Sequence, residues 1–179
     1  MANVTAWKLC TVGVNQPSTG DIDWVNPGNI TATDTTYAVA TDNGVDIVKI
    51  LHGKGFGFNV PATATIVGIE TRVSGYKTSD KDLSVSIAIE SGGGYTYGTP
   101  VNLGFTGSYQ TIVKGGATNL FNLNLTNPEL ITAAKFNDAE FSVVVWQVPI
   151  AGTGEQFADS VEARLYYQVN GPFPTHFNS

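Results

Sequence analysis

Apolar and polar residues alternate along several short stretches of the chain. The clearest stretch is 82–90, where the apolar positions are Leu83, Val85, Ile87 and Ile89 and the polar ones include Ser84, Ser86 and Glu90. Because successive side chains of a strand point to opposite faces, this period of two predicts a strand with one buried face. Residues 65–76 and 161–168 show the same alternation, so they are predicted strands as well.

Further strands are predicted at 45–51, 100–104, 109–113 and 121–125, between turn signals rich in glycine, proline and asparagine. Residues 141–148 are apolar at both parities, which is typical of a central strand covered on both sides or meeting another subunit. The one predicted helix covers 126–136, with Thr126 or Asn127 as its cap and Pro128 in its first turn. Short strands at this spacing predict a two-sheet sandwich, whose core we expect to contain Leu83, Val85, Ile87, Phe121, Leu123, Val143 and Leu165.

The domain organisation predicted from composition is an arm at 1–20, a sandwich at 21–170 and a tail at 171–179. Lys8 is the only charged side chain of the arm, and Trp7, Leu9 and Val12 are too apolar to remain in water. These residues are predicted to dock on a neighbouring subunit; the alternative is that the arm folds back as an edge strand of its own sandwich. In the tail, two prolines rule out a central strand, and Phe173 and Phe177 are candidate assembly contacts.

Charge and leader signals narrow the possible partners. The formal net charge is −6, and the nine Lys and Arg residues are scattered singly, which argues against nucleic-acid binding. The first residues lack the apolar core of a signal peptide, and no run of about 18 apolar residues predicts a membrane span. We therefore expect a soluble protein made in the cytosol. Cys10 cannot form an internal disulfide, since it is the only cysteine, but a bridge from the arm to a partner thiol stays open.

Candidate catalytic and metal-binding residues are sparse. His52 and His176 lie far apart with no cysteine or carboxylate at ligand spacing, so they are interpreted as a surface group and a tail residue. Three acidic pairs, at 21 and 23, 80 and 82, and 138 and 140, contain the oxygen ligands that calcium prefers, but solvated loop carboxylates are the simpler interpretation. No nucleophile, base or metal constellation is present in the sequence. The prediction is a protein that is not an enzyme and holds no cofactor and no metal.

A series of short motifs resembles a jelly-roll domain that recurs among virion proteins of tailed phages. The motifs are W.NP.N from Trp24, GFGF.VPA.ATI.GI over 55–69, KGG.TNLF.L over 114–123, and D.V.ARLYY over 159–167. The resemblance covers about 145 residues. It implies a jelly-roll β-sandwich used as a decoration, cement or tail-appendage module, and so an all-β fold with one short helix and extended N- and C-terminal tails.

The resulting functional hypothesis is a capsid decoration or cement protein that resides in the virion. Its partners would be major capsid or tail subunits and further copies of itself. A trimer is one of the oligomeric states left open. Binding to nucleic acid or to a membrane is not expected. The assembly contacts would be Trp7, Leu9, Cys10, Val12, Phe173 and Phe177. The alternative is a tail-fibre or receptor-binding module that binds carbohydrate through Tyr95, Tyr97 and Trp146, although core packing is the simpler role for Trp146.

Overall fold

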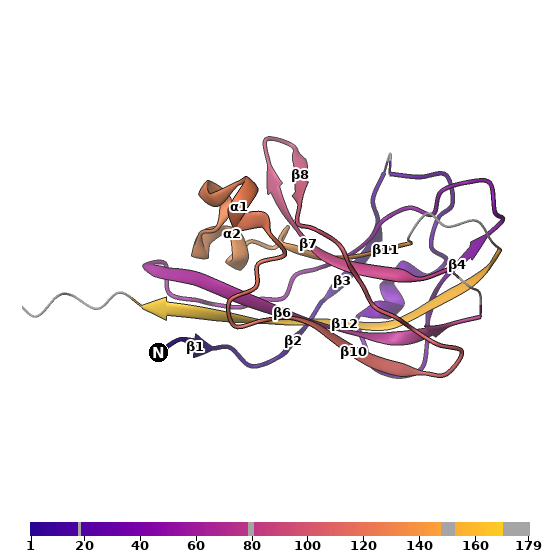
Figure 1. The fold of residues 1–179 in the computed structure, drawn as a ribbon, viewed down its shortest axis with the longest axis horizontal. Coiled ribbons are helices and arrows are strands. Elements are labelled where there is room, and N and C mark those ends of the chain that lie inside the picture. Colours follow the sequence, from indigo (N-terminus) through magenta and orange to yellow (C-terminus); the bar gives the residue numbers. More distant parts are fainter. Residues whose placement is uncertain (18, 79–80, 148–152, 170–179) are drawn as a thin grey trace, which may run out of the picture.

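The fold is a jelly-roll-type β-sandwich of two antiparallel sheets, seen as two layers in Figure 1. This computed structural model describes residues 1–17, 19–78, 81–147 and 153–169. Each sheet contains six of the strands found in these ranges. The all-β, two-sheet prediction is therefore confirmed.

The first sheet, here called sheet A, is built around two long strands, β6 (Ala64–Lys77) and β12 (Gly154–Val169), which pair along most of their length. β10 (Gln110–Gly116) pairs with the free side of β6. Three short strands lie along the other side of β12, namely β1 (Asn3–Val4), β2 (Lys8–Leu9) and β4 (Ala38–Asp42).

The second sheet, here called sheet B, has β11 (Ser142–Gln147) at its centre, between β5 (Leu51–Lys54) and β7 (Leu83–Ser91). β3 (Val12–Asn15) extends the sheet beyond β5. On the other side, β8 (Gly94–Tyr97) and β9 (Val101–Asn102) both pair with β7. The segment 141–148, which is apolar at both parities, thus contains a central strand. This agrees with the first of the two interpretations given for it from the sequence.

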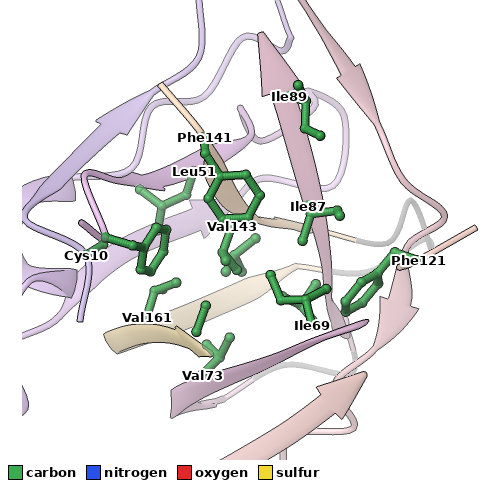
Figure 2. Close-up of a cluster of buried hydrophobic side chains, with 14 of the residues drawn as sticks. Cys10, Leu51, Ile69, Val73, Ile87, Ile89, Phe121, Phe141, Val143 and Val161 are labelled. Carbon is green, nitrogen blue, oxygen red and sulfur yellow. The ribbon is translucent and has the colours of Figure 1, made fainter. Parts of the chain in front are cut away.

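Apolar side chains from both sheets fill the space between the layers, as Figure 2 shows for β6 and β12 of sheet A and for β5, β7 and β11 of sheet B. All seven residues predicted for the core are buried, each with at most 1 % of its surface exposed. For Leu83, Val85 and Ile87 the strict alternation of β7 explains this success, because only one parity of that strand can face the other sheet.

The helical segments differ from the prediction. The chain makes α1 (Leu123–Thr126), a 3₁₀ turn η2 (Pro128–Leu130) and α2 (Ala133–Asn137), besides an early 3₁₀ turn η1 (Pro27–Ile30). Asn127 occupies the N-cap position of η2, with Pro128 in the first turn as predicted, but its side chain makes no capping hydrogen bond. Thr132 caps α2, and its side chain accepts a hydrogen bond from the Lys135 amide. In the described part of the chain, none of these helices is long and apolar enough to cross a membrane.

The predicted strand at 121–125 is wrong. Phe121 and Asn122 adopt left-handed backbone angles, with φ of 52° and 59°, and turn the chain into α1. Phe121 and Leu123 are nevertheless buried, so their two-residue spacing arises from a turn that packs both side chains inward.

The strand predicted at 45–51 is displaced to Leu51–Lys54, and residues 45–47 are exposed. The following segment is not a strand, since Gly55 and Gly57 have positive φ values that break an extended chain. Phe56 and Phe58 still face the same way, with stacked rings whose centroids lie 5.5 Å apart.

The arm lies on its own sandwich, which is the alternative arrangement considered from the sequence. Residues 3–9 supply β1 and β2 to sheet A, and residues 12–15 supply β3 to sheet B. Cys10, between β2 and β3, is buried among the core residues labelled in Figure 2. The tail at 171–179, with Phe173, His176 and Phe177, lies outside the described residues.

Candidate functional site

The residues on the outer face of sheet B follow from the strand register. Antiparallel partners share a face, and Val144 of β11 lies opposite His52 of β5 and Ser86 of β7. By the same parity Trp146 lies on this face too. On β8, Tyr97 lies opposite Ala88 and Tyr95 opposite Glu90, which extends the same face toward the hairpin.

Three aromatic side chains form a continuous series on this face, here called the aromatic row: Tyr95, Tyr97 and Trp146. The ring centroids of Tyr95 and Tyr97 are 6.3 Å apart, and those of Tyr97 and Trp146 are 5.9 Å apart. All three side chains are half-buried. The structure therefore brings together the three residues that the sequence nominated for glycan contact, and it places Trp146 outside the core.

His52 lies beneath the aromatic row and is fully buried, so the expectation of a surface histidine is wrong. Its ring centroid is 4.7 Å from that of Tyr95 and 6.0 Å from that of Tyr97. Burial, followed by the nearby Lys54 charge, lowers the pKa of His52 from 6.5 to about 3. The imidazole is therefore neutral near pH 7 and acts as a flat, uncharged support for the two tyrosine rings.

The hydrogen bonds of His52 indicate which nitrogen carries its proton. Ser142 Oγ lies 3.1 Å from Nδ1 and donates its own proton to the Glu140 carbonyl at 3.0 Å. The hydroxyl therefore accepts from Nδ1–H, which leaves Nε2 to accept from the Tyr97 hydroxyl at 3.5 Å. This chain of bonds links the row to the backbone just before β11.

A charged pair fixes the Tyr95 end of the row. Lys54 Nζ donates to the Tyr95 hydroxyl at 2.6 Å and to Glu140 Oε2 at 2.8 Å, and the Tyr95 hydroxyl donates to the same carboxylate at 2.7 Å. These hydrogen bonds, the one from Lys54 first, lower the pKa of Glu140. Glu140 is thus ionised at neutral pH and engaged with two donors.

At its other end the row borders a pocket of about 340 Å³. Its walls come from the segment between β3 and η1, from the chain leading into β5, from the β8–β9 connection and from the end of β11. The lining residues are Thr19, Ile47, Val48, Ile50, Pro100, Trp146 and Gln147. Trp146 therefore belongs to both the row and the pocket.

At least one carboxylate of each acidic pair considered for calcium is engaged with a protein group instead. Asp23 pairs with Lys49 at 2.9 Å, Asp82 is bound by Lys77 and by the Asn102 amide, and Asp138 accepts from the Glu140 backbone at 2.9 Å. Asp80 lies outside the described residues. Within the described ranges, no group of three His, Cys, Asp or Glu side chains is placed to hold a metal ion.

The predicted assembly residues are dispersed. Trp7 lies on the outer face of sheet A, with the guanidinium carbons of Arg72 and Arg164 at 4.6 and 4.7 Å from its ring centroid. Leu9 is half-buried and Val12 is 45 % exposed. Cys10 is buried, its thiol donates to the Ile30 carbonyl at 3.3 Å, and burial raises its pKa to about 12, so it cannot reach a partner thiol in this fold. The docking role of the other residues stays a prediction.

The outer face of sheet A carries a ladder of ion pairs around Trp7. Arg72 binds Glu162 through two nitrogens, at 2.5 and 2.6 Å, and Arg164 Nε lies 2.5 Å from Glu70 Oε2. Each guanidinium is thus held by a carboxylate and also packs on the indole. Nearer the other end of this face, Tyr76 and Phe157 stack on one another with centroids 4.2 Å apart.

Sequence reasoning missed the residues that support the aromatic row, namely His52, Lys54, Glu140 and Ser142. They come from two distant segments, and their position under the row depends on the pairing of β5 with β11 and on the β7–β8 hairpin. The available signal was the polar parity of β5, where His52 and Lys54 alternate with Leu51 and Gly53. That parity indicates one face but does not identify what covers it.

Comparisons with known proteins report fold similarity only. No family model matches the chain, and no curated protein matches it. Among solved structures, it resembles the CBM22-1 xylan-binding domain of Paenibacillus barcinonensis Xyn10C, with a TM-score of 0.41 and 8 % identity over 96 % of this chain and 97 % of that one. It also resembles TmCBM61, solved with β-1,4-galactotriose, with a TM-score of 0.38 and 11 % identity over 88 % and 86 %.

A third similar structure holds the CBM22-1 and GH10 modules of Clostridium thermocellum xylanase 10B, with a TM-score of 0.44 and 8 % identity over 98 % of this chain and 30 % of that one. These neighbours contain carbohydrate-binding modules of β-sandwich fold, and none is described as a virion protein. At such identities and TM-scores the likeness concerns the sandwich architecture alone.

Proposed function

We propose that the protein is a carbohydrate-binding β-sandwich that holds a glycan on the outer face of sheet B. The observation that carries this proposal is the aromatic row, Tyr95, Tyr97 and Trp146, with successive centroids 6.3 and 5.9 Å apart. Sugar rings present apolar C–H faces with polar hydroxyl edges, and tyrosine and tryptophan combine an apolar ring with a polar tip. Both residue types are also the commonest anchors of binding energy at interfaces.

The row is held in place before any ligand arrives. Tyr95 is fixed by Lys54 and Glu140, and Tyr97 is supported by His52. Immobilising rotamer-rich side chains on binding costs about 0.5–1.5 kcal/mol each. Rings that are already fixed avoid much of that cost, which suits a site that must gain affinity from weak stacking contacts.

Binding without turnover is the form of this function that the local electrostatics favour. A general acid for glycoside cleavage needs a raised pKa so that it remains protonated. Glu140, the carboxylate bonded to the row, has a lowered pKa because Lys54 and Tyr95 donate to it. The neutral His52 is fully buried and so cannot reach a substrate.

A glycan array followed by calorimetry on the full-length protein tests the proposal. Trp146→Ala and Tyr97→Ala should each weaken binding of the best glycan by about tenfold or more, as for aromatic anchors of an interface. Tyr76→Ala, on the outer face of sheet A, is the matched control and should leave affinity unchanged. The proposal fails if no glycan binds, or if both row variants bind like the unaltered protein.

The virion role is a separate proposal that rests on the sequence resemblance. In it, the protein is a capsid decoration or tail subunit that contacts other virion proteins and forms homo-oligomers. A receptor-binding tail module would join this role to the glycan site. Sedimentation of the purified chain at micromolar concentrations tests the oligomer, and a monomer throughout would contradict it.

A further inference from the structure

β10 is an edge strand of sheet A. In the part of the chain that the structure describes, its residues 110–114 pair with β6 and with no second strand. A strand in this position presents a row of unpaired backbone N–H and C=O groups, to which a further strand can bind. Edge strands are commonly protected by proline or by several charged residues, whereas β10 has no proline and one charged residue, Lys114.

Other sides of the two sheets are covered by the chain itself. On β3, the outermost strand of sheet B, the Asn15 side chain accepts from the Trp24 amide at 2.8 Å and donates to the Trp24 carbonyl at 2.9 Å. Gly13 lies so close to Pro27 that a Cβ atom would come within 2.0 Å of the Pro27 carbonyl oxygen. On sheet A, the short strands β1, β2 and β4 pair with the side of β12 that faces away from β6. Among the described residues, the outer side of β10 has no such partner.

Two exposed apolar side chains lie along this edge on the outer face of sheet A. Val113 is 48 % exposed, and Tyr109, which directly precedes β10, is 42 % exposed. Val113 lies opposite Arg72, a residue of the outer face, and Tyr109 has the same parity as Val113. The Tyr109 ring is held in place because its hydroxyl donates to Asp159 Oδ2 at 2.5 Å. The edge thus combines unpaired backbone groups with fixed apolar surface.

The sequence of this edge is self-complementary about Thr111. When two copies of the strand pair antiparallel with Thr111 opposite Thr111, the Tyr109 of each copy lies opposite the Val113 of the other. Aromatic pairs with β-branched residues and threonine pairs both stabilise antiparallel strands. Lys114 falls opposite Ser108 in this register, so no like charges face one another.

The backbone supports the same centre. The chain bends at 107–108 before the strand, and Gly115, with φ of 99°, interrupts the extended conformation after it. The stretch that is free to pair is therefore 109–114, and Thr111 lies near its middle.

We infer that the protein forms a two-fold symmetric dimer in which two β10 edges pair antiparallel about Thr111 and join the two A sheets. A contact of this kind uses the same surface on both copies and closes with two of them. A second copy is the partner that the edge favours, because one strand supplies both Tyr109 and the Val113 that meets it. The inference gives the homo-oligomer of the virion proposal a defined interface.

The dimer has a consequence for the aromatic row. Directly opposite residues of paired strands share a face, so the outer faces of the two A sheets become continuous and both B sheets lie on the other side. The two aromatic rows then face the same direction. A surface that carries many glycans can bind both rows at once, which raises avidity without any new contact. This consequence, unlike the dimer itself, rests on the proposed glycan-binding function.

Sedimentation equilibrium of the full-length protein tests the interface. The unaltered protein should form dimers at micromolar concentrations. Val113→Glu removes the apolar partner of Tyr109 and should raise the dissociation constant of the dimer at least about tenfold. Val4→Glu is the matched control, because Val4 is 49 % exposed and lies on β1, on the other side of sheet A. Its variant should keep the dissociation constant within about twofold of the unaltered protein.

Thr111→Glu and Thr111→Lys test the two-fold axis. Each variant places like charges directly opposite one another and should be monomeric, with circular dichroism melts to show that it is folded. An equimolar mixture of the two variants places a carboxylate opposite an ammonium group and should restore the dimer. A mixture that stays monomeric overturns the inferred register and with it the inference.

The remaining outcomes separate this interface from the earlier proposals. A dimer that persists in both Thr111 variants, a dimer that Val4→Glu disrupts, or a trimer overturns the β10 inference and leaves the homo-oligomer of the virion proposal intact. An unaltered protein that is monomeric at every concentration overturns both. None of these results changes the proposal that the aromatic row binds a glycan, which calorimetry tests separately.

Discussion

Trp7 and Trp146 occupy opposite outer faces of the same sandwich, and their surroundings differ in kind. Trp7 lies against two guanidinium groups, and each of these is bound in turn by a carboxylate across β6 and β12. Trp146 contacts the Tyr97 ring and lines an apolar pocket, and no cation lies over its indole in the described part of the chain. On sheet A, the Trp7 ring is already packed by protein groups. On sheet B, the Trp146 ring lies next to a cavity.

The comparison shows that residue type alone does not identify a binding site. Both tryptophans are half-buried, and the sequence offered Trp7 as an assembly contact and Trp146 as a glycan contact. The deciding difference is whether nearby charged groups already pack on the ring. A cation over an indole contributes about 0.5–2 kcal/mol, so Trp7 has a role in holding the arm to sheet A.

The largest expected effect is a loss of stability when Trp7 is replaced by alanine. Trp7→Ala should lower the free energy of unfolding by about 2–3 kcal/mol, since it removes two cation–π contacts and partly buried aromatic surface. Denaturant melts monitored by circular dichroism measure this change. Glycan affinity should not change, and a loss below about 0.5 kcal/mol would show that the arm is not held by this contact.

A second prediction uses the neutral His52 under the row. Its folded pKa of about 3 lies below the ordinary 6.5, so between these values the unfolded chain binds a proton that the native protein does not. Stability from this group is therefore lost as pH falls, by about 2 kcal/mol between pH 7 and pH 5. His52→Gln should flatten that part of the pH profile. An unchanged profile in the variant would contradict a buried, neutral histidine.

The next effect in size is the stability cost of Trp146→Ala. We expect about 1 kcal/mol, mainly from its contact with Tyr97, because no cation packs on the ring. Thermal melts of the Trp7→Ala and Trp146→Ala variants, run under the same conditions, measure the two losses of stability. If Trp146→Ala is the more destabilising, the interpretation of an open face on sheet B is wrong.

The smallest predicted effect concerns the ion-pair ladder of sheet A. Glu70→Gln leaves Arg164 without its carboxylate and should cost about 0.5 kcal/mol, as partly exposed pairs do. The cost should shrink further when salt is raised, because the pair is screened. Melts at low and high salt test this, and a cost that does not depend on salt would argue against an electrostatic origin.

The sequence predicted the core of the sandwich well and its helical insertion poorly. Along β7 the register leaves only one face for Val85 and Ile87, so the period of two was sufficient. At 121–125 the same period was misleading, because Phe121 and Leu123 reach the core from a left-handed turn. Local alternation does not distinguish a strand from such a turn, since both bury every second side chain.

The candidate site was predictable only in part. Tyr95 and Tyr97 stand out because they follow a glycine-rich turn, and Trp146 because its strand is apolar at both parities. Their assembly into a row depends on β8 and β11 lying on either side of β7, which is long-range pairing. The support from His52 and the ion pair of Lys54 with Glu140 depend on the same pairing. The pocket is still harder to predict from the sequence, because four separate segments of the chain form its walls.

Because of its position, the Cys10 thiol can report on how the sandwich opens. It is the only cysteine in the chain, and it sits where the backbone passes from β2 of one sheet to β3 of the other. A thiol-reactive dye can modify it only when that crossing separates from the core. The labelling rate therefore measures the opening of the arm, and comparison with the global unfolding rate tells whether the first strands detach before the remaining sandwich does.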